Sequence, residues 1–243
     1  MSSSLSGKTA LVSGGSRGIG RAIVERLDGA GAAVAFNYAR NAELAEEVAR
    51  GIKSRGGKAV ALPANVATSG EIRRMFEEAE KALGPLDIVI ANAGVHIQKP
   101  LAESTEADYD YIFDVNTCGI FFTLQEAARR VRDGGRIVVL STGGTKMHFP
   151  NMSRYLGSKG AVEQFARTLA LELGPRKIAV NILSPGFTET GMFPEEYREF
   201  AESLSPFKRV GAPEDVADVA LFLAGDESRW LTGQDLQAGG GVV

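Results

Sequence analysis

The sequence predicts an α/β protein whose parallel sheet carries helices on both faces. Two observations support this. Apolar segments of strand length alternate with helical patterns along all 243 residues, and most of these strands are nearly continuous apolar runs. Continuous apolar runs are typical of strands covered on both sides. Regular alternation favours parallel strands joined by right-handed crossovers. Because no repeat, low-complexity tract or linker divides the chain, we expect one domain spanning residues 1–243.

The elements follow in a simple order. The expected strands cover residues 9–13, 33–37, 59–63, 88–92, 137–141, 179–184 and a short last segment, 235–237. Helical patterns between them cover residues 21–31, 42–55, 70–83, 108–131, 155–173 and 213–224. Residues 189–207 form an irregular, amphipathic segment that we expect to act as a lid, although its aromatic residues could instead cover core or a subunit interface.

Composition excludes several classes of protein. The formal charge of -3 includes no basic excess that could neutralise nucleic-acid phosphates. The only cysteine, Cys118, cannot form an intrachain disulfide, and its apolar neighbours predict a core position. A reducing cytoplasm suits such a chain. We see no signal sequence and no apolar segment of membrane-spanning length, so we expect a cytoplasmic protein.

A glycine turn follows the first expected strand, with the spacing Gly14-x-x-x-Gly18-x-Gly20. Glycines allow a tight turn and a close backbone approach to a ligand, while the free amides of the next helix point at its phosphates. The glycines alone fit an ordinary loop equally well. The flanking strand and helix favour a variant of the dinucleotide-binding fingerprint.

The residues after the second strand bear on coenzyme choice. They read Asn37-Tyr38-Ala39-Arg40, without the acidic residue that would bind the ribose 2′-hydroxyl of NAD. Arg17 in the glycine turn and Arg40 could instead pair with a 2′-phosphate. We therefore expect NADP(H) to be favoured over NAD(H).

Tyr155 and Lys159 are four residues apart at the start of a helical pattern, which places both side chains on one face. An ammonium beside a phenol favours the phenolate, so we expect Lys159 to lower the Tyr155 pKa toward the range of a general acid/base. Such pairs are also common on helix surfaces, and this pair gains meaning only with other motifs.

Those motifs occur where the other strands end, which is the edge at which open parallel sheets bind ligands. They are Asn65-Val66, Asn92-Ala93-Gly94, Ser141-Thr142 and Pro185-Gly186-Phe187-Thr188.

Taken in order, the glycine turn, these motifs, Asn116 and the Tyr155-x-x-x-Lys159 pair resemble the short-chain dehydrogenase/reductase family from Leu5 to the carboxyl end. The resemblance implies a doubly wound Rossmann fold with seven parallel strands, and commonly a homotetramer, with the helices at 108–131 and 155–173 in the dimer contact. It also implies NADP(H)-dependent interconversion of a carbonyl and a secondary alcohol.

The resemblance assigns roles to individual residues. Tyr155 would exchange the proton, Lys159 would bind the nicotinamide ribose, and Asn116 would belong to a water-mediated proton relay. A hydroxyl after the fifth strand would bind the substrate oxygen. The expected cofactor contacts are Gly14, Ser16, Arg17, Gly18, Ile19, Gly20, Asn37, Tyr38, Arg40, Asn65, Val66, Asn92, Ala93, Gly94, Tyr155, Lys159, Pro185, Gly186 and Thr188.

Two departures from the family pattern leave choices open. The family usually has serine thirteen residues before its tyrosine, but here that count reaches Thr142, with Ser141 one residue earlier. Register favours Thr142 and chemistry favours Ser141. Asn65 replaces the aspartate that usually contacts the adenine. Asn116 is a polar residue inside a helical run, where its amide can bond a neighbouring carbonyl or water and distort the helical hydrogen-bond ladder.

The substrate is the least constrained prediction. Similar family members reduce 3-oxoacyl thioesters, but other small ketones, sugars and steroids also fit, as does a non-catalytic NADP-binding sensor or scaffold. A complete Asn116, Tyr155 and Lys159 set argues against the sensor, which needs no aligned proton donor. His96 and His148 could line the substrate pocket or be exposed loop residues. We expect no metal, because nearby carboxylates are too few.

Overall fold

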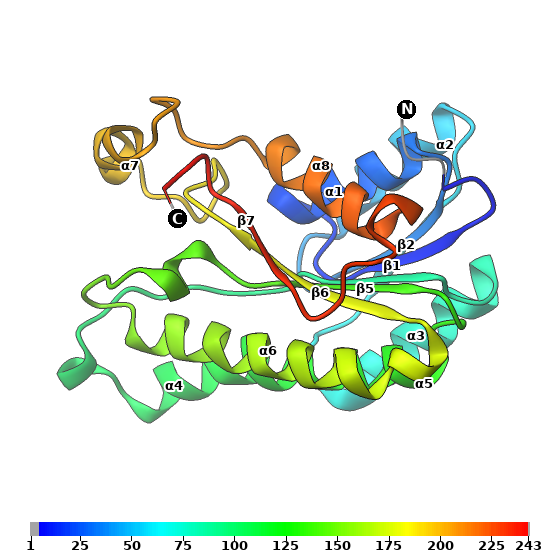
Figure 1. Cartoon of the computed structure of the whole chain (residues 1–243), viewed down its shortest axis with the longest axis horizontal. Coiled ribbons are helices and arrows are strands. Elements are labelled where there is room, and N and C mark those ends of the chain that lie inside the picture. The colour runs from blue at the N-terminus through cyan, green and yellow to red at the C-terminus, as the bar shows by residue number, and fades with distance from the viewer. Residues whose placement is uncertain (1–4, 243) are drawn as a thin grey trace.

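The computed structural model describes residues 5–242 and contains one seven-stranded parallel sheet (Figure 1). The strands are β1 (Thr9–Val12), β2 (Ala33–Tyr38), β3 (Ala59–Pro63), β4 (Ile88–Ala91), β5 (Arg136–Leu140), β6 (Ala179–Pro185) and β7 (Asp235–Ala238). Their order across the sheet is β3-β2-β1-β4-β5-β6-β7. The predicted doubly wound Rossmann fold is confirmed, with strand ends shifted by at most one residue.

Helices cover both faces of the sheet. One layer contains α1 (Gly18–Gly29), α2 (Ala42–Ser54) and α8 (Pro213–Ala224), and the other contains α3 (Ser69–Leu83), α4 (Glu106–Phe113), α5 (Gly119–Arg130) and α6 (Ser153–Glu172) (Figure 1). A short helix, α7 (Arg198–Leu204), lies beyond the end of the sheet together with the carboxyl end of the chain. Among residues 5–242, no helix is both long enough and apolar enough to cross a membrane.

The alternation of side chains along each strand divides the core into two apolar layers. On β2, Val34 and Phe36 pack in the layer with α1, α2 and α8, whereas Ala35 packs in the layer with α3, α5 and α6. All three side chains are fully buried. Successive residues of a strand point to opposite faces, so a strand buried on both sides must be apolar throughout, as this sequence is.

The predicted helix at 108–131 is interrupted. Residues Asp114–Cys118 form a π-helical segment between α4 and α5, with Asn116 fully buried at its centre. The helical ladder is therefore distorted at Asn116, as such a residue can bring about, and the expectation of one regular helix is wrong. The Asn116 side chain bonds to the backbone of Val95, a loop residue far away in the sequence, which stabilises the bulge.

Cys118 corrects a second prediction. Its side chain is exposed rather than in the core, although Gly119 and Ile120 beside it are buried. An apolar stretch of sequence does not reveal which face of a helix each residue occupies, and position 118 lies on the outward face.

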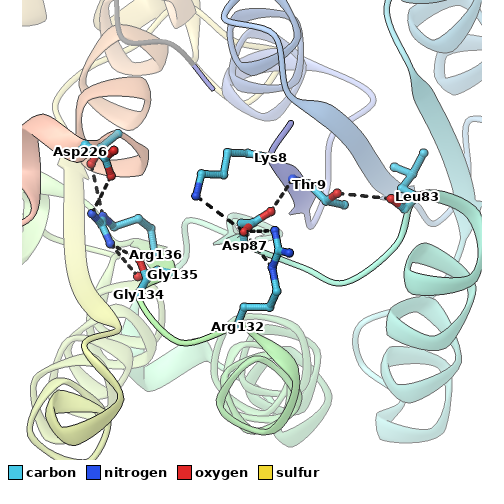
Figure 2. A network of polar contacts seen from close by, with 10 residues as sticks. Lys8, Thr9, Leu83, Asp87, Arg132, Gly134, Gly135, Arg136 and Asp226 are labelled. Atoms are coloured by element: carbon cyan, nitrogen blue, oxygen red, sulfur yellow. Dashed lines mark hydrogen bonds and ion pairs between the residues drawn. The ribbon is translucent and has the colours of Figure 1, made fainter. Parts of the chain in front are cut away.

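A network of polar side chains lies at the amino ends of the strands (Figure 2). The Asp87 carboxylate accepts hydrogen bonds from the Thr9 amide at 2.8 Å and the Arg132 Nε at 3.0 Å. Arg136 donates to the carbonyl oxygen of Gly225 at 3.2 Å and pairs with Asp226. The buried Asp87 and Arg136 side chains thus satisfy backbone groups at the sheet end that parallel α/β proteins do not use for ligands, and we assign the network a structural role.

The order of the strands sets the place of the site. The chain reverses its direction of winding between β1 and β4, which are neighbours in the sheet. Loops that leave the carboxyl ends of these strands run to opposite sides and open a crevice, where ligands bind in folds of this kind. The glycine turn follows β1 and Asn92 follows β4, so both predicted motifs lie at this crevice.

Candidate active site

The glycine turn is shaped by close contacts that exclude side chains. Gly14 and Gly18 have φ values of 71° and 52°, in the left-handed region. A Cβ atom on Gly20 would lie 2.1 Å from the Gly14 carbonyl oxygen, and one on Gly15 would lie 2.5 Å from Phe36. The backbone can therefore turn tightly from β1 into α1 only with glycine at these positions.

Two asparagines brace this turn from neighbouring strands. The buried Asn37 side chain accepts a hydrogen bond from the Gly14 amide at 2.8 Å and donates one to the Ala64 carbonyl at 2.8 Å. The Asn92 side chain donates to the carbonyls of Ser13 at 2.8 Å and Gly14 at 3.1 Å. Asn37 and Asn92 thus use these side-chain groups to shape the turn, a role that the sequence pattern did not distinguish from direct cofactor contact.

The amino end of α1 fits a dinucleotide phosphate. The helix begins after Arg17 without a side-chain cap, so its first amides are left for a ligand. Arg17 and Arg40 are exposed, and neither forms an ion pair within residues 5–242. Of the other predicted contacts here, Ser16 is buried, whereas Ile19 and Tyr38 are half-buried.

The remaining predicted cofactor contacts extend along the same edge. Asn65 is exposed, and its side-chain oxygen caps the amide of Ala67 at 3.1 Å, while Val66 is buried. Ala93 and Gly94 follow β4 and are half-buried. A Cβ atom on Gly94 would lie 3.5 Å from the Lys159 ammonium and 3.4 Å from the Asn116 side chain, so this loop lies directly against two predicted catalytic residues.

Tyr155 and Lys159 do lie in the same site, but their electrostatics correct the prediction. Burial raises the Tyr155 pKa, and only its hydrogen bond with Thr142 lowers it. Burial also lowers the Lys159 pKa to about 8. The Lys159 ammonium donates to the Leu140 carbonyl at 2.8 Å. In this structure desolvation outweighs any attraction from the ammonium, so the expected depression of the Tyr155 pKa by Lys159 is wrong.

The structure distinguishes the two candidate hydroxyls. Ser141 Oγ donates to the buried Glu163 carboxylate at 2.8 Å, on α6. Thr142 lines the cavity beside Tyr155, and its side chain is the group that lowers the pKa of the phenol. Its Oγ1 also accepts from the Gly144 amide at 3.2 Å. Because accepting this bond leaves the hydroxyl proton free to donate, Thr142 presents the group that a substrate oxygen would need.

Asn116 joins three parts of the site through its side chain. Its side-chain oxygen accepts from the Val95 amide at 2.8 Å, and its amide donates to the Val95 carbonyl at 2.9 Å and to Ser158 Oγ at 3.1 Å. The side chain therefore ties the π segment to both the loop after β4 and α6. These contacts hold the predicted catalytic residues together from three separate parts of the chain.

A cavity of about 210 Å³ opens in front of Tyr155 and Thr142. Its lining includes the predicted residues Ile19, Ser141, Pro185, Gly186 and Thr188, together with His96. Residues that sequence reasoning did not assign to the pocket also line it: Gln98, Met147, Phe149, Met152, Phe187 and Val242. Most of this lining is apolar. Burial lowers the pKa of His96, which therefore stays neutral near pH 7.

The segment at 189–207 supplies one wall. Thr190, Met192, Phe193, Tyr197 and Phe200 line the cavity. Phe187 makes edge-to-face contacts with Phe149, Phe193 and Phe200, with ring centroids 5.9, 6.3 and 6.2 Å apart. The amphipathic pattern of this segment was the available signal for its place beside the pocket. Nothing in that pattern revealed that Phe187 would join this segment to Phe149, which comes from the loop after β5.

Comparison with known proteins agrees with this geometry. The family model described as enoyl-(acyl carrier protein) reductase matches residues 14–243. The tetrahydroxynaphthalene reductase of Pyricularia oryzae is 40% identical over 99% of this chain and 91% of its own length.

Two solved structures share the fold closely. A short-chain dehydrogenase from Burkholderia cenocepacia in complex with NADP is 38% identical, with 98% of each chain covered and a TM-score of 0.95. The landomycin C-6 ketoreductase LanV, with bound NADP and rabelomycin, is 40% identical over 99% of this chain and 98% of its own, with a TM-score of 0.91. The seven-stranded sheet, the braced glycine turn and these matches together place the chain in the short-chain dehydrogenase/reductase family, as an oxidoreductase.

Proposed function

We propose that this protein is an NADPH-dependent reductase that converts an apolar, ring-bearing ketone to a secondary alcohol. The observation that carries the proposal is the cavity itself: Tyr155 and Thr142 present two hydroxyl groups at one place on a wall that is otherwise rich in aromatic and methionine side chains. A pocket of this composition orients a flat apolar ligand through a few polar contacts.

The reaction follows from the order of these groups. NADPH, when bound at the amino end of α1, supplies the hydride to the carbonyl carbon. Thr142 donates a hydrogen bond to the carbonyl oxygen and holds it near Tyr155. The Tyr155 phenol then gives its proton to that oxygen as negative charge develops there. Its raised pKa keeps the phenol protonated at neutral pH, which is the state that a reductase needs.

Lys159 and Asn116 act behind the tyrosine. With a pKa of about 8, Lys159 is protonated at pH 7 yet can lose its proton readily. An ammonium here would stabilise the phenolate that Tyr155 becomes after proton transfer. We assign Asn116 the task of holding the loop after β4 and α6 at a fixed separation, because its amide bonds to both.

The pocket favours one substrate class among those that the sequence left open. Sugars need many polar partners, which a largely apolar lining does not offer. Aromatic side chains provide flat apolar surface for fused rings. The names of two relatives support this choice, since one is a tetrahydroxynaphthalene reductase and another binds rabelomycin. A 3-oxoacyl thioester is the main competitor, because a flexible acyl chain could also enter an apolar cavity.

The test is NADPH oxidation at 340 nm against a panel of ketones. We expect bicyclic aromatic ketones such as a tetralone to give higher kcat/KM than a 3-oxoacyl thioester, an open-chain ketone or a ketose. The reverse order between the tetralone and the thioester would reject the substrate class but keep the reductase. Tight NADPH binding without turnover of any ketone would favour a sensor or scaffold protein.

Coenzyme preference is a separate prediction. We expect the double variant Arg17→Ala and Arg40→Ala to weaken NADPH binding by about 10²-fold or more and NADH binding by less than about threefold, because only NADPH carries the 2′-phosphate that two guanidinium groups can neutralise. Fluorescence titration with both coenzymes measures this. The matched control is Arg50→Ala, an exposed arginine on α2. Equal affinities of the unmodified protein for NADPH and NADH would contradict the preference.

We also propose that the protein is cytoplasmic and assembles as a homo-oligomer. Exposed Tyr109, Tyr111 and Phe121 on α4 and α5 support a subunit contact on this face, in agreement with the family resemblance. Light scattering of the purified protein is expected to give a dimer or tetramer. A monomer at micromolar concentration would contradict this part.

A further inference from the structure

Four charged side chains beside the pocket form a network that the proposed reaction does not use. Lys146 lies in the loop after β5, Glu163 and Arg167 are on α6, and Asp235 is on β7. The Lys146 ammonium is 3.0 Å from the Glu163 carboxylate and 2.9 Å from that of Asp235. Arg167 is 3.2 Å from Glu163 and 3.8 Å from Asp235. We call these four residues the charge network.

Glu163 is the centre of the charge network. It is 4% exposed and receives hydrogen bonds from Ser141 Oγ at 2.8 Å and Thr145 Oγ1 at 2.6 Å, in addition to its two cations. Burial alone would raise its pKa, but the hydrogen bonds from Thr145, Ser141 and Lys146 hold the pKa below its ordinary value. Glu163 is therefore ionised at neutral pH. Two carboxylates facing two cations leave the charge network balanced, as the buried carboxylate of Glu163 requires.

These contacts determine the shape of the loop that carries Thr142. Ser141, Thr145 and Lys146 enclose Thr142 in the sequence, and all three bond to the same carboxylate. Glu163 lies one helical turn beyond Lys159 and two beyond Tyr155, so α6 presents these three side chains along one face. The Thr142 loop and the Tyr155 phenol are thus both attached to one rigid helix.

A second attachment comes from the other side of the pocket. Asp235 accepts a hydrogen bond from Ser184 Oγ at 2.6 Å, and Ser184 immediately precedes Pro185 and Gly186 in the pocket wall. The charge network therefore joins the loop after β5, α6, the end of β6 and β7. Side chains that only stabilised the sheet would not need to meet at this one loop.

We propose that Glu163 is a positioning residue that holds the segment 141–146 so that the Thr142 hydroxyl stays directed at Tyr155, while Ser141 anchors the loop instead of binding substrate. This inference rests on the proposed reductase function and deepens it. It also explains why Thr142 rather than Ser141 would bind substrate: the Ser141 side chain is committed to Glu163.

The test is a double-mutant cycle between Glu163→Gln and Thr142→Ala, measured as kcat for ketone reduction at saturating NADPH. Glutamine keeps the size of the side chain but removes the charge that holds Lys146. We expect Glu163→Gln alone to lower kcat about tenfold, because the loop that holds Thr142 loses the charge that anchors Lys146, and to change the Kd for NADPH by less than about twofold. Coupled residues lose the same interaction only once, so the effects of the two substitutions should not add. In the Thr142→Ala background the same change should cost less than about twofold. Glu172→Gln, an exposed glutamate at the end of the same helix, serves as the control and should leave kcat unchanged.

The outcomes separate the two proposals. Equal losses from Glu163→Gln in both backgrounds, or no loss in either, would overturn the positioning role while the reductase function stands. An unmodified enzyme that reduces no ketone would overturn the reductase function and this inference with it. If Glu163→Gln does not fold, Lys146→Met tests the same loop, because Lys146 is half-exposed. We again expect a loss of kcat that disappears in the Thr142→Ala background.

Discussion

Tyr155→Phe is expected to lower kcat for ketone reduction by about 10³-fold while leaving the Kd for NADPH within about twofold, because the phenol is the only group that we assign to proton donation. Phenylalanine keeps the ring and its edge-to-face contact with His96, whose ring centroid lies 4.7 Å away. The change therefore removes one hydroxyl and little else. Stopped-flow or steady-state NADPH oxidation measures kcat, and fluorescence titration measures coenzyme affinity.

The control for this variant is Tyr109→Phe. Tyr109 is on α4, about half exposed, and its ring stacks on Phe113 at 4.1 Å, a contact that phenylalanine preserves. We expect it to keep full activity. If Tyr155→Phe retained more than about one-tenth of the original kcat, another group would have to supply the proton, and the assignment of Tyr155 would be wrong.

The second large effect is expected from Lys159→Met, in both activity and its dependence on pH. Loss of the ammonium should lower kcat/KM by about 10²-fold or more, because the phenolate left after proton transfer loses the charge that we assign to its stabilisation. In the unmodified enzyme we expect kcat/KM for NADPH to fall as pH rises through about 8, the pKa of Lys159. This parameter reports groups of the free enzyme. The decline should be absent from Lys159→Met.

The free energy of unfolding should rise with pH in the range where kcat/KM falls. The ordinary pKa of a lysine, which applies to the unfolded chain, is 10.5, whereas the pKa of Lys159 in the folded protein is about 8. Below pH 8 both states are protonated, and the folded state carries the full cost of a buried ammonium. Between pH 8 and 10.5 the unfolded state binds the extra proton, so the contribution of Lys159 to the free energy of unfolding rises with pH, by on the order of 3 kcal/mol in total.

Denaturant unfolding at several pH values measures this contribution. Lys159→Met should show a smaller rise in stability between pH 8 and 10 than the unmodified protein, whereas the exposed Lys81→Met should not differ from it. Identical pH dependence in the unmodified protein and Lys159→Met would mean that Lys159 is solvated, and the low pKa would be wrong. Fully active Lys159→Met would contradict its place in the reaction.

The local chemistry of this protein could be predicted from its sequence because it depends on spacing along the chain. Alternating apolar runs and helical patterns predicted the parallel sheet, since the burial of a strand or a helix face follows from residue periods. The glycine spacing predicted the turn into α1, because glycine adopts a positive φ without strain, as Gly14 and Gly18 do at 71° and 52°. The four-residue interval predicted that Tyr155 and Lys159 share a helix face.

Side-chain direction and desolvation were decided only by the tertiary structure. Ser141 and Thr142 are adjacent and chemically alike, and only the approach of Glu163 from α6 engages one of the two hydroxyls, that of Ser141, in a hydrogen bond. The Tyr155 pKa rises instead of falling because residues remote in sequence exclude water from it. Asn37 braces the glycine turn because β1 and β2 are neighbours in the sheet. Each outcome depends on which distant segments meet, and residue spacing along the chain carries no information about such meetings.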